Sequence, residues 1–182
     1  AAVVTTGVLE PDVVDLVDAA SDRDLEVDIL TVNAPDLGNV LEAGLRKGST
    51  AERFLYLSSS TVYRRQLVGR LLEELSGEDP AEVAAAATEG GDDSHITNLL
   101  ALRRGAVDDV LSMVGTTPVR TIRDLFQALP DTCDGRLVTE ARGWAVDVTN
   151  AQKAWRAAQN LWDDCRKPVD GIISRYFNRS IS

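Results

Sequence analysis

Apolar residues recur every three or four positions along most of this chain, which is the spacing of amphipathic helices. Pro11, Pro35 and Pro118 stand at first-turn positions and open three of these segments, the last of them with Thr117 as its predicted cap. The pattern predicts an all-α protein, a helical bundle with minimal β structure. A chain of 182 residues is expected to form one domain, residues 1–182. The apolar stripes lie in residues 13–20, 37–45, 67–75, 96–114, 119–129 and 144–162.

Four segments depart from this spacing. Residues 3–9 indicate a short extended lead-in, and residues 26–32 alternate weakly, as in a strand or a helical continuation. Residues 76–94 are rich in glycine and acidic residues, which indicates a soft loop. The run from 53 to 63 is aromatic and β-branched and leads directly into a helical pattern. We expect this run to be the hinge of the architecture.

The last long helix, predicted over roughly residues 137–164, has the most regular pattern. Its apolar positions follow one another at alternating steps of four and three. Large and small residues alternate along this seam, which suits close packing against a neighbouring helix. We therefore predict that the seam is buried inside the bundle. Its members are Trp144, Val148, Ala151, Trp155, Ala158 and Trp162.

The formal net charge of −10 argues against a broad nucleic-acid-binding surface, which is normally basic. The positively charged residues are nevertheless mostly arginine, with sixteen arginines and three lysines. Two explanations stay open: a GC-rich genome, or arginines concentrated where the protein contacts phosphate. The second fits an acidic subunit that touches RNA on one small surface. No apolar run approaches ~18 residues, so no membrane partner is expected.

Patterns typical of catalytic and metal sites are missing from the sequence. His95, the one histidine, lies at a predicted helix start, where a surface role is favoured over a base or a ligand. There is no C-x-x-C pair, no Walker loop and no G-x-S-x-G elbow. Cys133 and Cys165 form no disulfide framework, which favours a reducing compartment. We expect no catalytic residue, no metal site and no cofactor.

Residues 39–63, NVLEAGLRKGSTAERFLYLSSSTVY, resemble the part of extended short-chain dehydrogenases that leads into their catalytic serine strand. The family's glycine-rich dinucleotide turn has no counterpart, because Gly7 stands alone after the first extended segment. The family's Tyr-x-x-x-Lys, in which the lysine lowers the tyrosine pKa for proton transfer, is also missing. An enzyme of this kind is therefore the third interpretation.

A second resemblance covers more of the chain. The pair Arg53-Phe54, and then Val62-Tyr63-Arg64 before a helix, resembles a segment of the coat proteins of rod-shaped, tobacco mosaic virus-like plant RNA viruses. The stretches VVTT, PDVVDLVDAA and PDLGNVLEAGLRKG are similar in spacing to that family's lead-in and first helix pair. Arg142 with Asp147, followed by TNAQKAWRAAQNLW, resembles its long RNA-facing helix, and RYFNRS resembles its tail.

The resemblance implies a four-helix-bundle core, with extra helices in the long connection between Gly77 and Arg136. It also implies a capsid protein that self-assembles into a helical rod and packages single-stranded genomic RNA without sequence preference. It places the protein in the virion and the host cytoplasm. RNA phosphate would be contacted by arginines. Arg104 has a second explanation, an ion pair with Asp108 one helical turn away. The candidate RNA-binding residues are Arg142, Arg103, Arg104, Arg64 and Arg53.

The resemblance also gives the acidic balance a role. Carboxylates of adjacent subunits would repel one another near neutral pH, and protonation would relieve this repulsion, because like charges held close raise each other's pKa. The alternative of a different class is a non-enzymatic helical scaffold or interaction protein without RNA binding.

Overall fold

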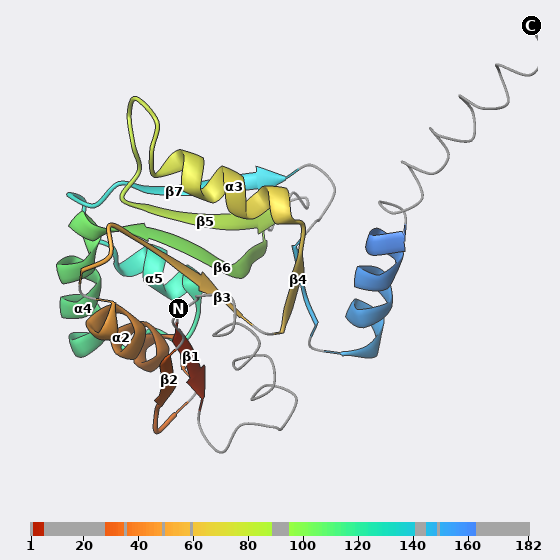
Figure 1. Cartoon of the computed structure of the whole chain (residues 1–182), viewed down its shortest axis with the longest axis horizontal. Helices are drawn as coiled ribbons and strands as arrows, with labels where there is room; N and C mark the ends of the chain where they lie inside the picture. Colours follow the sequence, from red (N-terminus) through yellow and green to blue (C-terminus); the bar gives the residue numbers. More distant parts are fainter. Residues whose placement is uncertain are drawn as a thin grey trace, which may run out of the picture.

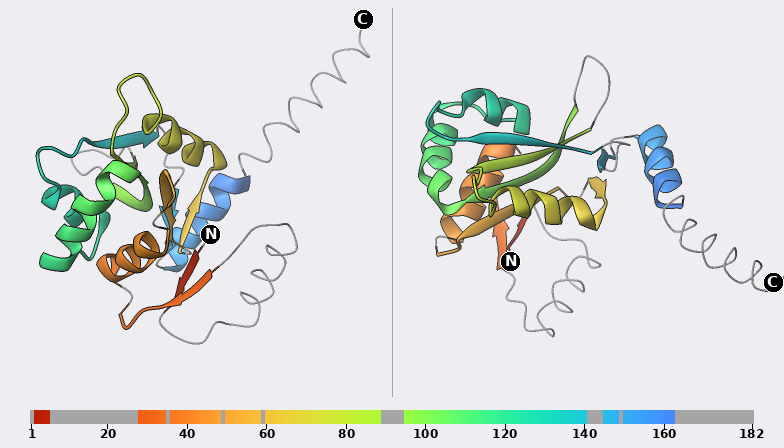
Figure 2. Two further views of the ribbon diagram at one scale, coloured as in Figure 1. Left: turned by 60° about the vertical axis from the view of Figure 1, so that its left-hand side comes forward. Right: turned by 90° about the horizontal axis from the view of Figure 1, so that it is seen from above.

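A mixed four-stranded sheet forms the centre of the protein in the computed structural model, with helices on both of its faces (Figures 1 and 2). The structure describes residues 2–5, 28–34, 36–48, 50–58, 60–88, 95–140, 145–148 and 150–162. The expectations for residues 13–20, Arg142, Trp144 and the tail lie outside these residues.

The central sheet has the strand order β3–β6–β5–β7. β6 (His95–Arg103) is antiparallel to both of its neighbours, β3 (Arg53–Leu57) and β5 (Val83–Thr88). β7 (Gly135–Glu140) is parallel to β5 and forms one edge of the sheet. The sheet therefore combines segments that lie far apart in the sequence.

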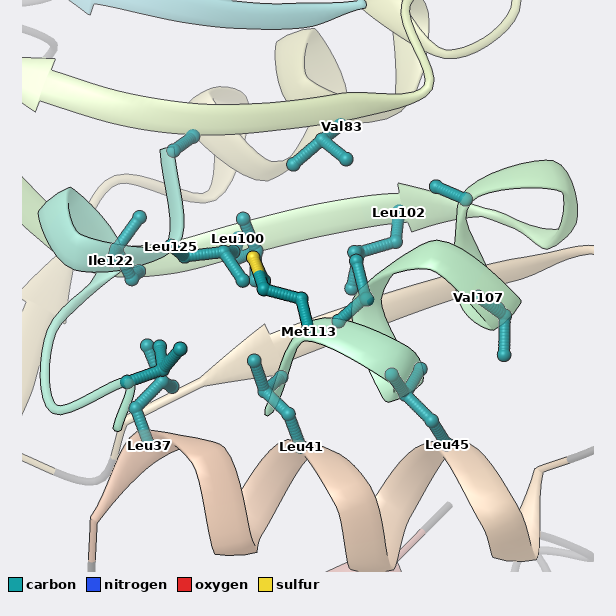
Figure 3. Close-up of a cluster of buried hydrophobic side chains, with 14 of the residues drawn as sticks. Leu37, Leu41, Leu45, Val83, Leu100, Leu102, Val107, Met113, Ile122 and Leu125 are labelled. Atoms are coloured by element: carbon teal, nitrogen blue, oxygen red, sulfur yellow. The ribbon is translucent and has the colours of Figure 1, made fainter. Parts of the chain in front are cut away.

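Each face of the sheet has its own hydrophobic core. α3 (Arg65–Glu74) covers one face, and α2 (Leu37–Lys47), α4 (Val107–Thr116) and α5 (Ile122–Ala128) lie on the other (Figure 1). Alternate residues of β5 and β6 point to the two cores, since successive side chains of a strand face opposite ways. The α3 core contains Leu67, Leu71, Leu75, Ala84, Ala86, Leu99 and Ala101. The other core contains Leu37, Leu41, Leu45, Val83, Ala85, Leu100, Leu102, Val110, Ile122 and Leu125 (Figure 3).

Two short strand pairs accompany the sheet. β1 (Ala2–Thr5) runs parallel to β2 (Asp28–Thr31), and β4 (Thr61–Tyr63) runs antiparallel to β8 (Ala145–Asp147). The 3-10 turn η1 (Arg104–Ala106) joins β6 to α4. The ambiguous residues 26–32 thus contain a strand.

Side chains fix the starts of α2 and α5. Asp36 caps α2, accepting a hydrogen bond from the Asn39 N–H at 2.9 Å. Thr121 and Asp124 form a capping box at the start of α5, in which each side chain accepts a backbone N–H of the other residue. The N–H groups of Arg120 and Thr121 hold the pKa of Asp124 below its ordinary value. The sequence pattern predicted the start of this helix slightly too early, at Thr117-Pro118.

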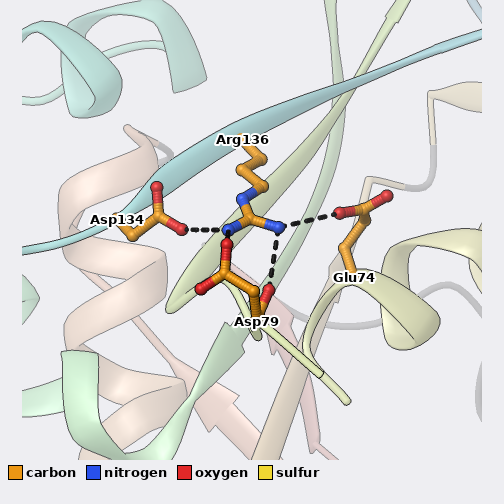
Figure 4. Close-up of polar contacts among 4 residues, drawn as sticks. All are labelled: Glu74, Asp79, Asp134 and Arg136. Carbon is orange, nitrogen blue, oxygen red and sulfur yellow. Dashed lines mark hydrogen bonds and ion pairs between the residues drawn. The ribbon is translucent and has the colours of Figure 1, made fainter. Parts of the chain in front are cut away.

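Arg136, in the second position of β7, lies among three carboxylates (Figure 4). Its Nη2 is 2.7 Å from Asp79 Oδ2 and 2.8 Å from Asp134 Oδ2, and its Nη1 is 3.7 Å from Glu74 Oε2. Nη1 also donates to the Asp79 carbonyl at 2.8 Å. This cluster joins the start of β7 to the end of α3 and to the segment that follows it.

The prediction of an all-α bundle is wrong. Residues 83–88, assigned to a soft loop, and residues 95–103, assigned to a helix, are the two inner strands of the sheet. Both strands are covered on both faces, so their apolar residues do not alternate with polar ones. As a result, the apolar residues Ile96, Leu99 and Leu100 follow one another at the spacing of a helix, although they lie on a strand. The stripes that begin after Pro35 and Arg64 do form helices, α2 and α3.

The predicted long helix over 137–164 is also wrong in its first half, which contains β7 and β8. Residues 151–162 are helical and stand to one side of the sheet, drawn in blue in Figures 1 and 2. Trp155 and Trp162 are 67% and 69% exposed, so these members of the seam are not buried in a bundle. Among the described residues, no helix has the length and apolarity that a membrane span requires.

Candidate functional site

A polar turn follows β3 at its carboxyl end. The Ser58 N–H donates to the Asn98 carbonyl of β6 at 3.2 Å, and the Thr61 N–H donates back to the Ser58 carbonyl at 3.1 Å. The hydroxyls of Ser58 and Ser60 are 2.8 Å apart, and the Ser60 N–H donates to the Ser58 hydroxyl at 3.3 Å. We call Ser58, Ser60 and Thr61 the β3 turn. It presents two neighbouring hydroxyls at the end of a buried sheet.

The β3 turn is tied to a segment almost ninety residues further along the chain. Thr61 is the register partner of Asp147 on β8, and the Val148 N–H donates to the Ser60 carbonyl at 2.6 Å. Asn150, two residues after Val148, caps the 151–162 helix, because its side-chain oxygen accepts the Lys153 N–H at 2.9 Å. The start of this helix therefore lies near the β3 turn in space, although the two are far apart in the sequence. The start of a helix attracts anions through its backbone dipole.

A hollow of about 400 Å³ lies between the start of α2 and the loop from α4 to α5. The Gly38 N–H donates to the Val119 carbonyl at 2.9 Å, which holds the two segments together. A Cβ on Gly38 would lie 3.3 Å from both the Val119 carbonyl oxygen and Asp36 Oδ1, so a glycine allows this close approach. Polar groups line most of the hollow: Asp36, Asn39, Thr116, Thr117 and Arg120.

The hollow and the β3 turn lie at the same end of the sheet. Arg53 at the start of β3 is paired with Arg103 at the end of β6, from which η1 leads into α4 at Val107. Val107 and Leu45 therefore mark the end of the core where β3 begins. Leu37 and Ile122 lie at the opposite end (Figure 3), and Gly38 of the hollow follows Leu37 directly. Ligands of open α/β sheets bind at the carboxyl ends of strands, which is the end that both features share.

The structure gathers three of the five arginines predicted to bind RNA, at the other end of the sheet. Arg53 and Arg103 are register partners, and the Arg104 N–H donates to the Glu52 carbonyl at 2.9 Å. Arg53 also donates from Nη1 to the Ser76 hydroxyl at 2.8 Å. Arg64 lies apart from them, immediately before α3. Among the described residues, Arg104 makes no ion pair with Asp108.

Sequence reasoning did not find the β3 turn as a site. The serines were noticed only as part of a resemblance to dehydrogenases, and a hydroxyl-bearing turn has no characteristic spacing. Its link to Val148 depends on the β4–β8 pairing, which a helical interpretation of residues 137–164 excludes. No group of three or more histidine, cysteine or acidic side chains that could hold a metal ion lies among the described residues.

No protein-family model matches the sequence. No curated protein matches it either. Solved structures share the fold, which is that of nucleotidyltransferase-like and glycosyltransferase-like proteins. HddC from Yersinia pseudotuberculosis is 13% identical with a TM-score of 0.56, and the alignment covers 88% of this chain and 78% of HddC. HddC also matches as a complex with GMP-PN.

Two further structures have the same fold. CMP:2-keto-3-deoxy-manno-octonic acid synthetase in complex with CTP is 15% identical with a TM-score of 0.58, covering 88% of this chain and 80% of the synthetase. A glycosyltransferase involved in glycosylation of the major capsid of PBCV-1 is 10% identical with a TM-score of 0.51. The alignment covers 87% of this chain and 97% of the glycosyltransferase. At these identities the likeness shows the fold alone.

These matches overturn the coat-protein interpretation. The shared fold is a mixed α/β sheet found in enzymes, whereas the coat-protein resemblance implies a four-helix bundle. The expected capsid function, RNA partner, helical assembly and virion location rested on that bundle and are therefore wrong, as is the expectation of a non-enzyme. Of the two alternatives to the capsid protein, the enzyme agrees better with these matches than the capsid protein does.

Proposed function

We propose that this protein is a nucleotide-dependent transferase of the nucleotidyltransferase type, with its nucleotide site at the carboxyl end of β3. In such a reaction an acceptor oxygen attacks the α-phosphorus of a nucleoside triphosphate. A new P–O bond forms, the bond between the α-phosphorus and its bridging oxygen breaks, and pyrophosphate leaves. A proton on the acceptor oxygen passes to solvent.

The observation that carries the proposal is the β3 turn, in which two hydroxyls 2.8 Å apart lie at the carboxyl end of a sheet strand. This position is where α/β sheets bind ligands. Hydroxyl and backbone N–H groups are suitable donors to phosphate oxygens, and the helix that begins after Asn150 adds a favourable dipole. The hollow beside Asp36 and Asn39, at the same end, offers room and polar groups for the rest of the nucleotide.

The shared fold supports the same class of ligand. HddC and the synthetase were both solved with nucleotides, GMP-PN and CTP. Phosphoryl transfer depends mainly on positioning and on stabilisation of charge, so a site without a nucleophilic side chain is compatible with it. The glycosyltransferase with this fold suggests a second candidate, transfer of a sugar from a nucleotide sugar.

The test is calorimetric titration of the full chain with CTP and GTP in the presence of Mg²⁺. We expect binding, and we expect the double variant S58A/S60A to weaken it by about tenfold, which is about 1.4 kcal/mol. The matched control is R103Q/R104Q, since Arg103 and Arg104 lie at the other end of the sheet. That control should bind nucleotide as the parent does.

Products then separate the two candidate reactions. Release of pyrophosphate from a nucleoside triphosphate with an acceptor present indicates nucleotidyl transfer. Release of a nucleoside diphosphate from a nucleotide sugar indicates glycosyl transfer. Failure of the parent to bind any nucleotide at millimolar concentration would contradict the proposal, and loss of binding in R103Q/R104Q with retention in S58A/S60A would move the site to the arginine end.

A further inference from the structure

Two exposed tryptophans alternate with two exposed alanines on one face of the 151–162 helix. Trp155 is 67% and Trp162 69% exposed, and Ala151 and Ala158 between them are exposed as well. Ala157, in contrast, is only 3% exposed. At about 100° per residue, Ala157 lies roughly opposite these four residues on the helix. The two tryptophans therefore lie on the exposed side of the helix, roughly opposite its buried side at Ala157.

Exposed apolar surface of this kind marks an interaction site more often than chance. We define the Trp155 face as Ala151, Trp155, Ala158 and Trp162. Its steps of four, three and four residues are those of the core positions of a coiled coil. We propose that the Trp155 face packs against the same face of a second copy of this chain, in an antiparallel two-fold contact.

The order of large and small residues selects the antiparallel arrangement. If the two-fold axis passes between Trp155 and Ala158, Trp155 of one copy lies opposite Ala158 of the other. The same register places Trp162 opposite Ala151. Every tryptophan then has a small residue facing it, which lets the two helices approach closely. In a parallel pair, the tryptophans of the two copies would meet one another.

The residues that flank the Trp155 face agree with this arrangement independently. Ala154 and Leu161 lie along one side of the face, and Gln152 and Gln159 along the other; all four are exposed, Leu161 by 45%. In the antiparallel pair, Ala154 lies beside Leu161 of the second copy, and Gln152 beside Gln159. Apolar flank meets apolar flank, and amide meets amide. A parallel pair would set the apolar flank against the amides. This self-complementarity favours a second copy over an unrelated partner.

The area that the proposed contact would bury indicates a weak association between the two copies. A buried tryptophan covers about 150–250 Å², so the four tryptophans of a pair contribute on the order of 600–1,000 Å². Specific interfaces bury about 1,200–2,000 Å² in total, so this contact is at the weak end, and we expect a dissociation constant in the micromolar range. A two-fold contact closes on itself and stops at two copies. Each copy carries a net charge of −10, so added salt should strengthen the pairing by screening the repulsion.

The experiment is sedimentation velocity of the full chain over a concentration series, followed by exchange of residues across the proposed contact. W155A and W162A should each raise the dissociation constant at least tenfold. A158W should weaken pairing as well, because Trp155 would then meet a second tryptophan. The double variant W155A/A158W should pair as the parent does, because each tryptophan again faces an alanine. L137A, at a 42% exposed leucine of β7, is the matched control and should change nothing.

Circular dichroism of each variant shows whether the helix is intact, and W162A tests the face without a bulky insertion. A parent that stays monomeric at the highest concentration overturns the proposal. So does dimerisation that survives W155A and W162A, or an A158W variant that pairs as well as the parent. A double variant no better than W155A alone would exclude the antiparallel register.

Discussion

The Arg136 guanidinium donates to the Asp79 carboxylate, with 2.7 Å between Nη2 and Oδ2, and thereby fastens the start of β7 to the segment after α3. Asp134 and Glu74 complete the cluster. The hydrogen bond that Arg136 donates to Asp79 raises the pKa of the Arg136 guanidinium above its ordinary value. Because Arg136 reaches the backbone carbonyl of Asp79 as well, its planar fork acts on both the side chain and the main chain.

We therefore expect R136K to lower the melting temperature, because an ammonium cannot reproduce these directed contacts. The effect should be small, since Asp79 is largely exposed and exposed ion pairs contribute little. It should also shrink when salt is added, because salt screens the pair. Thermal unfolding at low and high salt is the measurement, with R120K, at an exposed arginine, as the control. A decrease that is unchanged by salt would assign the role of Arg136 to packing instead.

Cys133 gives the clearest pH dependence. Burial, and then the carboxylate of Glu82, raise the pKa of this thiol from 9.0 to about 12. Below pH 9 the thiol is neutral in both the folded and the unfolded chain, and its contribution to stability is fully present. Between about pH 9 and 12 the unfolded chain loses the proton first, so the free energy of unfolding should fall as the pH rises.

Urea unfolding at pH 8 and pH 10.5 tests this, with C133A as the comparison. The substitution has its own packing effect at both pH values, but the fall between them should be smaller than in the parent. The same raised pKa predicts slow alkylation of Cys133 at pH 8 in a C165S background, because the thiolate is the reactive form. Rapid alkylation of the folded chain would contradict the burial of this thiol.

The capping box of α5 should have a measurable effect at one position. T121A removes the side-chain oxygen that accepts the Asp124 N–H and should cost about 0.5–2 kcal/mol of unfolding free energy, the usual effect of losing a helix N-cap. T117A should cost less, because the predicted cap at Thr117 is not the cap found. Chemical denaturation of both variants at pH 7 is the measurement. A larger cost for T117A than for T121A would place the helix start where the sequence pattern had it.

The same box contributes to acid sensitivity. The pKa of Asp124 is lowered, so its contribution to stability is present above pH 3.8 and is lost as the pH falls through its folded value. D124N should therefore unfold with a weaker dependence on pH below 4 than the parent.

The sequence predicted the parts of this fold that are local. Pro35 and Arg64 mark the starts of α2 and α3 because each is followed by an apolar stripe on one face of a helix. The inner strands could not be predicted in this way. Val83 and the four alanines after it are buried on both faces of the sheet, so they show no alternation of polar and apolar residues. Their identity as strands depends on partners that lie distant in the chain.

The candidate site was beyond sequence reasoning for a related reason. Ser60 and Val148 share a backbone hydrogen bond only because β4 pairs with β8. The arginines attracted attention because they are unusual in composition, but Arg53, Arg103 and Arg104 gather at the end of the sheet opposite the β3 turn. The seam that contains Trp155 and Trp162 was predicted from its spacing to be buried inside a bundle, and this is wrong, because both side chains are exposed. The burial of Ala157 on the other side of the same helix could not be predicted from that spacing.

A final prediction compares two helix residues of opposite exposure, Leu71 and Trp155. Leu71 of α3 is 0% exposed and packs against the sheet, so L71A should cost about 2–5 kcal/mol of unfolding free energy. Trp155 is the larger side chain, yet it is 67% exposed in the single chain, and W155A should cost less than about 1 kcal/mol. Urea unfolding at low protein concentration is the measurement, because dilution separates the chains and leaves only contacts within one copy. If W155A instead cost about 3–5 kcal/mol at that dilution, the tryptophan would be buried inside its own chain, and its face would not be available to a second copy.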